Sequence, residues 1–205
     1  TPLMSISGYA EIMMNGMVKP EDVQDFSGRI YHEASRLTNL VTDIIQLSRL
    51  DEKKSDMPFE VVDIYELAED IVAHLAPAAE KKRIALTLIG ETAAIRGVRH
   101  VLYEMFYNLA DNAVRYTYEG GNVGIYVGIR DGRPYYCVQD NGIGIPKNEQ
   151  SRIFERFYRV DKSHSRQTGG TGLGLSIVKH GAALHHAQIN LESELGKGTK
   201  MELVF

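Results

Sequence analysis

Two glycine-rich segments in the second half of the chain carry its strongest chemical signal. Residues 140–145 read Asp-Asn-Gly-Ile-Gly-Ile, so a carboxylate ends an apolar strand pattern and is followed by glycines that let a flat ligand approach the backbone. Residues 168–175 read Thr-Gly-Gly-Thr-Gly-Leu-Gly-Leu and open into an apolar helical pattern. A loop of this kind can wrap a phosphate, and the helix start adds unpaired N–H groups and about half a positive charge. The first segment therefore suits an adenine base, and the second suits its phosphates.

A helical pattern upstream of both segments carries two asparagines. Asn108 and Asn112 are four residues apart within an apolar pattern that spans residues 98–116, so they share one helix face. Their amide oxygens suit a hard cation such as Mg²⁺, which takes its other ligands from water and phosphate. Arg115 could pair with a phosphate oxygen, and Tyr116 could pack against a base or ribose. The alternative is a pair of asparagines that only decorate a surface helix. Because asparagine is a poor residue in the middle of a helix, the magnesium interpretation is favoured beside the two glycine segments.

A long polar stretch separates the two glycine segments. Between Gly144 and Gly169 the only apolar pattern is a short one at residues 153–157. A loop of this length inside a compact domain is usually functional. With glycines at both ends, it could close as a lid over a ligand.

The elements that must position these segments occupy residues 59–205. Asp63 can cap a helix with Glu66 in capping-box position, and Asp131-Gly132 is a strong hairpin signal. Runs of helices beside a largely antiparallel sheet predict a two-layer α+β sandwich. Strands are expected at residues 59–62, 84–89, 94–96, 122–129, 135–138, 189–191 and 201–205, with a helix after Asp63 and others at 98–116 and around 177–184.

Residues 1–50 read as a helical hairpin. Apolar residues recur at heptad spacing from Leu3 to Met17 and again from Phe26 to Leu47, with a break at residues 16–20. A hairpin alone buries each apolar stripe on one side only, so a four-helix bundle made from two chains is the favoured solution. The alternative is that the hairpin packs on the rest of its own chain. Residues 51–58 are charged and end in a proline, which predicts a linker between the hairpin and residues 59–205.

The overall composition is that of a globular protein and does not favour a nucleic-acid partner. Hydrophobic residues make up 43% and charged residues 24% of the 205 residues, and the formal net charge is −4, whereas nucleic-acid-binding domains are usually basic. No apolar run approaches the roughly 18 residues that span a bilayer, and no secretory signal opens the chain. The single cysteine, Cys137, is expected to be a buried structural thiol in a reducing compartment.

These motifs, in this order, resemble the sensor histidine kinases of two-component signalling. Residues 108–117 look like the N box of that family, and residues 140–145 look like its G1 box. Residues 153–158 resemble the F box, residues 170–175 the G2 box and residues 196–199 the final glycine motif. The hairpin is similar to the family's dimerisation and phosphotransfer domain. The fold implied for residues 59–205 is the Bergerat ATP-binding sandwich, which is shared with gyrase, the mismatch-repair MutL proteins and a chaperone ATPase.

The resemblance implies a role for each matching residue, with ATP and Mg²⁺ as cofactors. The residue matching Asp140 accepts a hydrogen bond from the adenine amino group, the one matching Asn112 binds magnesium with the Asn108 equivalent close by, and the one matching Arg115 touches phosphate. Arg159 or Arg166 could reach the phosphates from the lid. Further ATP contacts are implied at Tyr116, Gly142, Gly144, Ile145, Gly170, Thr171, Gly172, Leu173, Gly174 and Thr199.

The first residues have two interpretations. Thr1 and Pro2 could form the N-cap and first position of a helix, or the sequence could begin inside a longer helix. Residues 1–3 look like the Thr-Pro-Leu ending of the family's phosphoacceptor motif, so the resemblance favours the second and implies an acceptor histidine four residues before Thr1. Thr1 itself matches a residue that orients water in dephosphorylation. His32-Glu33 lacks the rest of that motif and is expected to be a surface pair.

The function implied is an ATP-dependent protein histidine kinase core. It would phosphorylate a histidine, pass the phosphoryl group to an aspartate of a response-regulator receiver domain and act as a homodimer in the cytoplasm, where full-length relatives are often anchored to the membrane. Phosphatase activity is also implied. One rival is a clamp-type ATPase, but those enzymes carry a glutamate general base where this chain has Asn108. The other rival is a nucleotide-binding scaffold without phosphotransfer.

Overall fold

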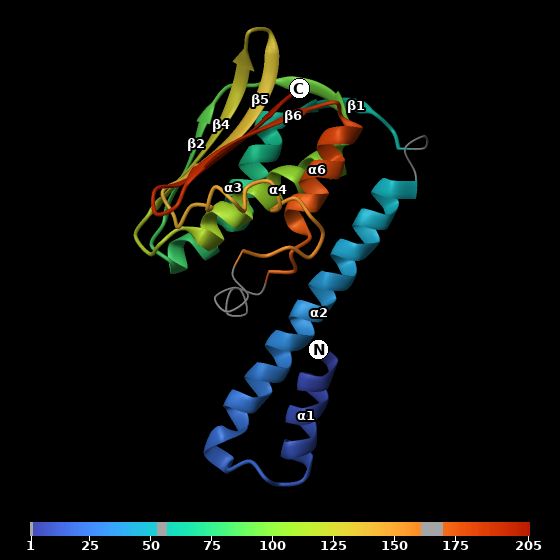
Figure 1. The fold of residues 1–205 in the computed structure, drawn as a ribbon, viewed down its shortest axis with the longest axis vertical. Coiled ribbons are helices and arrows are strands. Elements are labelled where there is room, and N and C mark those ends of the chain that lie inside the picture. Colours follow the sequence, from blue (N-terminus) through green and yellow to red (C-terminus); the bar gives the residue numbers. More distant parts are fainter. Residues whose placement is uncertain (1, 53–56, 161–169) are drawn as a thin grey trace.

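The chain folds into a helical hairpin and an α/β sandwich, and the computed structural model describes residues 2–52, 57–160 and 170–205 (Figure 1). The hairpin consists of α1 (Pro2–Met14), a short 3-10 turn η1 (Pro20–Asp22) and α2 (Val23–Glu52). Gly16, in the connecting turn, has a φ of 66°, a left-handed conformation that glycine adopts without strain. Helix α2 ends at Glu52 rather than Leu50, so it enters the stretch predicted as a linker, of which residues 53–56 lie outside the described residues.

The sandwich confirms the predicted two-layer α+β class. Its five-stranded sheet has the order β2-β4-β5-β7-β6, in which only β2 and β4 pair in parallel, and β1 pairs with β3 in a separate ribbon. Helices α3, α4 and α6 cover one face of the large sheet (Figure 1). The elements are β1 (Glu60–Asp63), α3 (Ile64–Lys81), β2 (Ala85–Gly90), β3 (Ala94–Gly97), α4 (Arg99–Tyr116), β4 (Asn122–Arg130), β5 (Arg133–Asp140), α6 (Gly174–Leu184), β6 (Gln188–Glu194) and β7 (Gly198–Val204).

Local signals in the sequence explain where several of these elements begin and turn. Asp63 caps α3 as predicted, because its side chain accepts a hydrogen bond from the Tyr65 N–H at 2.9 Å. The same oxygen accepts from the Ala93 N–H at 3.3 Å, so the cap also ties the helix start to the chain before β3. Asp131 and Gly132 both have positive φ, of 52° and 75°, which is the turn that a two-residue hairpin requires.

The core lies between the large sheet and its three helices. Phe106 of α4 stacks on Tyr136 of β5 with ring centroids 4.0 Å apart, and the Tyr136 hydroxyl donates to the Phe106 carbonyl at 3.2 Å. Cys137 is buried, and burial raises the pKa of its thiol to about 11. The thiol is therefore protonated at neutral pH, as expected for a structural rather than a reactive cysteine.

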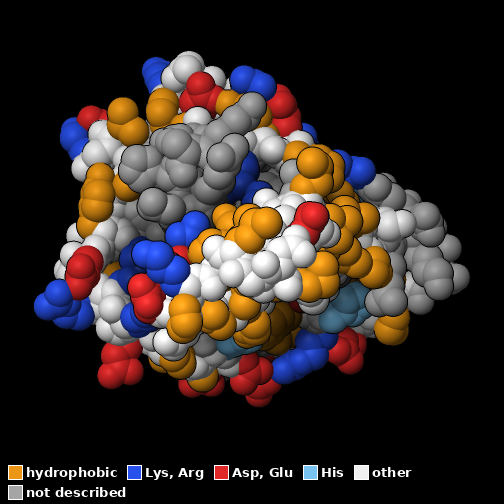
Figure 2. Space-filling view, turned by 90° about the horizontal axis from the view of Figure 1, so that it is seen from below, with side chains coloured by type: hydrophobic (Ala, Val, Ile, Leu, Met, Phe, Trp, Pro, Cys, Tyr) orange, Lys and Arg blue, Asp and Glu red, His pale blue; other side chains and the backbone are white. Residues whose placement is uncertain are grey.

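Helix α2 reaches beyond the hairpin and packs on the sandwich of its own chain. Leu47 is buried in the hydrophobic core cluster, Leu40 packs against that cluster, and α2 lies against α6. The alternative of packing on the same chain is thus realised for the C-terminal half of α2. By contrast, α1 has no buried residue among those described, and apolar side chains gather on the surface at the hairpin end of the molecule (Figure 2).

Candidate nucleotide-binding site

A cavity of about 790 Å³ opens between α4, the two glycine segments and α2. Its walls come from segments far apart in the sequence, which the sandwich brings to one end of the sheet. Two predicted site residues are not in its lining: Leu173 is fully buried in the core, and Gly142 packs behind the wall. The predicted residues that line the cavity are Asn108, Asn112, Arg115, Tyr116, Asp140, Gly144, Ile145, Arg159, Gly170, Thr171, Gly172, Gly174 and Thr199. Thr1 and Arg166 lie outside the described residues.

Asp140 is fixed at one end of the cavity by backbone donors. Its Oδ1 accepts from the Gly142 N–H at 2.8 Å and from the Thr199 N–H at 3.3 Å. The carboxylate is thus held through one oxygen, and a ligand can be recognised through the other. Burial raises the pKa of Asp140, although both backbone hydrogen bonds act to lower it. Apolar side chains of Val138, Ile143, Ile145 and Met201 also line the cavity and give this end the character expected of a base-binding pocket.

Two glycines let the first glycine segment pass close to neighbouring backbone. A Cβ on Gly144, whose φ is 66°, would lie 2.0 Å from the Glu194 carbonyl oxygen. A Cβ on Gly142 would lie 2.3 Å from the carbonyl oxygen of Tyr116, at the end of α4. Larger residues would therefore push the segment away from both α4 and β6.

Ser193 connects the first glycine segment to the final glycine motif. Its hydroxyl accepts from the Ile145 N–H at 2.8 Å and donates to the Gly198 carbonyl at 3.0 Å, and it lies 2.9 Å from the Thr199 hydroxyl. Sequence reasoning missed this residue, because a serine within an exposed strand pattern gives no signal of such a role.

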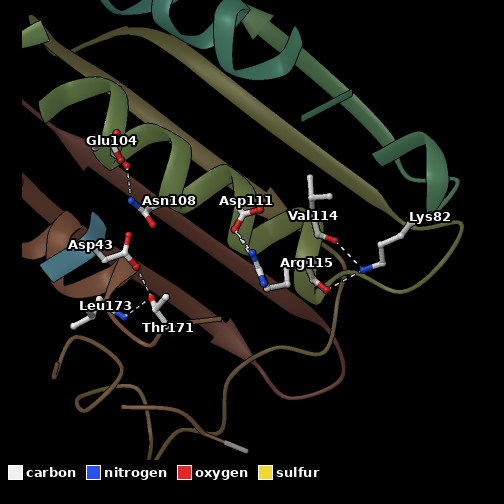
Figure 3. A network of polar contacts seen from close by, with 9 residues as sticks. All are labelled: Asp43, Lys82, Glu104, Asn108, Asp111, Val114, Arg115, Thr171 and Leu173. Carbon is white, nitrogen blue, oxygen red and sulfur yellow. Dashed lines mark hydrogen bonds and ion pairs between the residues drawn. The ribbon is translucent and has the colours of Figure 1, made fainter. Parts of the chain in front are cut away.

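The opposite end of the cavity carries the paired amides. The Asn108 Nδ2 donates to the Glu104 carbonyl at 2.8 Å, so the amide oxygen is directed away from its own helix (Figure 3). That oxygen lies only 2.4 Å from where a Cβ on Gly174 would stand. Asn112 lines the same cavity one turn further along α4. Among the described residues, no three His, Cys, Asp or Glu side chains gather as a metal site. Amide oxygens are ligands that Mg²⁺ accepts together with phosphate and water, so the chemistry of Asn108 and Asn112 is compatible with this ion.

Arg115 is held by a carboxylate of its own helix. Its Nη2 lies 2.8 Å from Asp111 Oδ2, one turn earlier on α4, and both side chains are about a quarter exposed (Figure 3). To bind a phosphate, the guanidinium would have to share or exchange this partner. Asp111 therefore sets the position from which Arg115 reaches the cavity.

The second glycine segment is joined to the predicted F box. Gly172 has a φ of 78°, and its carbonyl accepts from the Phe157 N–H at 2.9 Å. The Thr171 hydroxyl accepts from the Leu173 N–H at 3.2 Å, which shapes the turn immediately before α6. The helix start thus faces the cavity as the sequence predicted, with residues 161–169 outside the described part.

Helix α2 contributes a wall of the cavity that no motif predicted. The Thr171 hydroxyl donates to Asp43 Oδ2 at 2.5 Å, and Asn39 and Thr42 line the cavity beside it (Figure 3). Burial raises the pKa of Asp43, and the negative charge of Asp111 raises it further, while the hydrogen bond from Thr171 lowers it. The Asp43 carboxylate therefore accepts a hydrogen bond from a hydroxyl of the glycine segment that is expected to bind phosphate.

Replacing Asp43 with asparagine is expected to tighten the binding of a non-hydrolysable ATP analogue about fivefold. The substitution removes a negative charge that opposes a triphosphate, and such a pair is worth about 1 kcal/mol at 4 Å in a water-like medium. Titration calorimetry on the chain measures the change. Asp25→Asn is the matched control, because it removes an exposed carboxylate from the same helix. Weaker binding in Asp43→Asn would mean that this carboxylate supports the nucleotide instead.

Two family models together cover most of the chain. Residues 97–205 match the model described as histidine kinase-, DNA gyrase B-, and HSP90-like ATPase, and residues 1–53 match the His Kinase A (phospho-acceptor) domain. The first match covers the sandwich from the end of β3 onward, and the second covers α1 and α2.

Curated relatives and solved structures agree with these matches. The chain is 37% identical over 204 residues to the sensor-like histidine kinase SenX3 of Mycolicibacterium smegmatis, covering 99% of this chain and 53% of that protein. It is 31% identical over 206 residues to the sensor histidine kinase YkoH of Bacillus subtilis, covering 100% of this chain and 44% of the relative. The chain thus spans about half the length of these relatives.

Two solved structures resemble the whole chain. The full-length ShkA structure in complex with AMPPNP has a TM-score of 0.75 and 27% identity, covering 99% of this chain and 42% of that one. The Acinetobacter baumannii histidine kinase AdeS has a TM-score of 0.80 over 100% of this chain and 94% of that chain; its 20% identity supports the fold alone.

Proposed function

The chain belongs to the sensor histidine kinases, within the family of histidine kinase-, DNA gyrase B- and HSP90-like ATPases, and we propose that it is the ATP-dependent protein histidine kinase core of a two-component system. The observation that carries the proposal is the single cavity with two chemically different ends. At one end Asp140 is fixed by two backbone N–H groups, and at the other Asn108 and Asn112 present amides from one helix face. A carboxylate at one end and amides at the other would suit the base and the metal-bound phosphates of a nucleoside triphosphate.

Each part of the cavity has a role in this reaction. Asp140 would accept a hydrogen bond from the adenine amino group, while Ile143 and Ile145 exclude water from the base. Asn108 and Asn112 would hold Mg²⁺, and Arg115 would orient a phosphate. Bound Mg-ATP supplies the phosphoryl group and the counter-charge, and the protein's contribution is mainly positioning and electrostatic.

The phosphoryl group would pass to an imidazole of the hairpin and then to a partner. The acceptor would be the histidine that the resemblance implies four residues before Thr1, and Thr1 would orient water when the partner is dephosphorylated. The partner is a response-regulator receiver domain, and a structure of the histidine kinase ThkA in complex with the response regulator TrrA, with a TM-score of 0.79 to this chain, supports that choice. The core would lie in the cytoplasm, with any membrane anchor elsewhere in the full-length protein. Among the described helices, none combines the length and the apolar character of a membrane span.

A clamp-type ATPase is the rival, and the geometry of Asn108 counts against it. Its nitrogen is committed to the Glu104 carbonyl, and an amide oxygen cannot remove a proton from water as a glutamate would. The amide is suited to coordination rather than to base catalysis.

Labelled ATP tests the proposed reaction directly. A longer protein that includes the residues preceding Thr1 is incubated with γ-labelled ATP and Mg²⁺, and the labelled protein is then exposed to acid. Label that is lost in acid and retained in base is expected for a phosphohistidine. Acid-stable label, or hydrolysis of ATP without labelling, would favour the rival instead.

The hairpin is expected to make the chain a dimer in solution. Leu3, Met14 and Met17 are 61%, 80% and 74% exposed, an apolar surface that a second hairpin would cover in a four-helix bundle. Light scattering should give about 46 kDa, which is 2 × 22.9 kDa. Ile44→Glu, which places a charge on the apolar stripe of α2, should shift the mass to that of a monomer. Gln24→Glu adds the same charge at another exposed position of α2 and should leave the dimer intact; a monomeric wild type would contradict the bundle.

A further inference from the structure

Lys82 holds the C-terminal end of α4, the helix that carries Asn108 and Asn112. Its Nζ donates to the carbonyls of Val114 at 2.9 Å and Arg115 at 2.8 Å (Figure 3). It also donates to the Thr117 carbonyl at 2.7 Å. Lys82 is the C-cap residue of α3, so the contact joins two helices more than thirty positions apart in the chain. An α-helix leaves its last four carbonyls without partners inside the helix, and a buried end without other donors is costly.

All four terminal carbonyls of α4 have a donor. The Ala113 carbonyl accepts from the Thr117 N–H at 3.0 Å, and the Tyr116 carbonyl accepts from the Ile143 N–H at 3.1 Å. Lys82 donates to the two carbonyls that remain, those of Val114 and Arg115. The last turn of α4 is thus held from one side by Lys82 and from the other by the first glycine segment.

This last turn sets the position of residues at both ends of the cavity. Arg115 and Tyr116 are its final residues, and both line the cavity. The Tyr116 carbonyl contacts the glycine segment directly, through the Ile143 N–H and through the close approach of Gly142. Gly142 in turn donates to Asp140, so a shift of the helix end would reach the carboxylate through backbone contacts alone.

The positive charge of Lys82 stabilises the end of α4, but the surroundings make the charged form of Lys82 less favourable. An ammonium group at a helix C-terminus interacts favourably with the helix dipole. Burial, together with the positive charge of Arg115, nevertheless lowers the pKa of Lys82. The neighbouring Arg83 forms an exposed ion pair with Glu119, in the turn that follows α4, so the chain does not depend on Lys82 alone to keep the ends of α3 and α4 adjacent.

We propose that Lys82 is a positioning residue for nucleotide binding, which acts by fixing the last turn of α4 and thereby Arg115, Tyr116 and the adjacent glycine segment. Lys82 acts through the residues it holds in place. The inference rests on the proposed function, because it assumes that the cavity binds ATP.

Titration calorimetry with Mg²⁺ and the non-hydrolysable analogue AMPPNP on the chain separates affinity from the number of binding sites. Lys82→Met removes all three donors and the charge while keeping most of the side-chain length. We expect the Kd to rise about tenfold, since misplaced binding groups cost affinity steeply, while the number of sites per chain stays at the wild-type value. Lys82→Arg, which keeps charge and donors, should stay within about threefold of wild type. Lys81→Met is the matched control, because Lys81 is exposed at the preceding position, and its Kd should not change.

The outcomes separate positioning from folding and from a wrong functional assignment. A reduced number of sites with an unchanged Kd would mean that Lys82 only stabilises the fold, and an unchanged Kd at full occupancy would also overturn the inference. If circular dichroism shows that Lys82→Met is unfolded, Lys82→Gln takes its place, and its Kd must lie above that of Lys82→Arg. Failure of the wild-type chain to bind AMPPNP would instead remove the proposed function, and this inference with it.

Discussion

Replacing Asp140 with alanine is expected to weaken ATP binding by roughly 1.5–3 kcal/mol, the range for a hydrogen bond to a charged group. At about 1.4 kcal/mol per factor of ten, the Kd should rise between about tenfold and 150-fold. The loss has two parts: the adenine amino group loses its acceptor, and the N–H groups of Gly142 and Thr199 lose the oxygen that fixes the glycine segment. Calorimetric titration with AMPPNP measures it.

Asp70→Ala is the matched control for Asp140, because it removes an exposed carboxylate from α3. Its affinity should equal that of the wild type, and unchanged affinity in Asp140→Ala would count against the base-binding assignment. The wild type should also lose affinity as pH falls through the pKa of Asp140, which burial raises above the ordinary aspartate range. Because the folded state then binds this proton more tightly than the unfolded state, the same protonation stabilises the fold. Protonation of Asp140 should therefore lower the affinity without itself destabilising the fold.

Replacing Asn112 with alanine is expected to abolish phosphotransfer in a protein that includes the acceptor histidine. The substitution removes an oxygen ligand of Mg²⁺, and a metal that neutralises phosphate charge is worth several kcal/mol in the transition state. We expect the rate of labelling to fall roughly a hundredfold or more. The binding of ATP measured in EDTA should change little, since the base end of the cavity is intact.

Asn148→Ala serves as the control for Asn112, because Asn148 lies on the surface beside Glu149. Labelling by the control should match that of the wild type. Full labelling activity in Asn112→Ala would remove the magnesium role of this residue. Equal losses of ATP affinity with and without Mg²⁺ would show instead that Asn112 contacts the nucleotide itself.

Local patterns in the sequence predicted the elements and much of the cavity. The turn at Asp131-Gly132, the cap at Asp63 and the shared face of Asn108 and Asn112 each depend on neighbours within a few residues, so periodicity and turn chemistry were sufficient. The roles of Asn108 and Asn112 toward ATP and Mg²⁺ remain predictions. The glycine segments were recognisable because a positive φ, or neighbouring backbone that leaves no space for a Cβ, favours glycine, as at Gly144.

Contacts between distant elements could not be predicted in this way. Asp43 lies on a helix assigned to the other domain, and only the packing of α2 on α6 brings it to Thr171. Lys82 looks like an ordinary charged residue at a helix end, because the carbonyls that it binds belong to α4. Leu173 was expected at the nucleotide, yet the turn before α6 directs its side chain into the core.

The contact between Asn108 and Gly174 links two positions that no motif connects. A methyl group at position 174 would lie 2.4 Å from the Asn108 amide oxygen, so that side chain would have to shift, at the expense of its hydrogen bond to the Glu104 carbonyl. A homologue with alanine at position 174 is therefore expected to have a different residue, or a rotated amide, at position 108. An alignment of homologues should show positions 108 and 174 covarying, so that a substitution at one is accompanied by a substitution at the other.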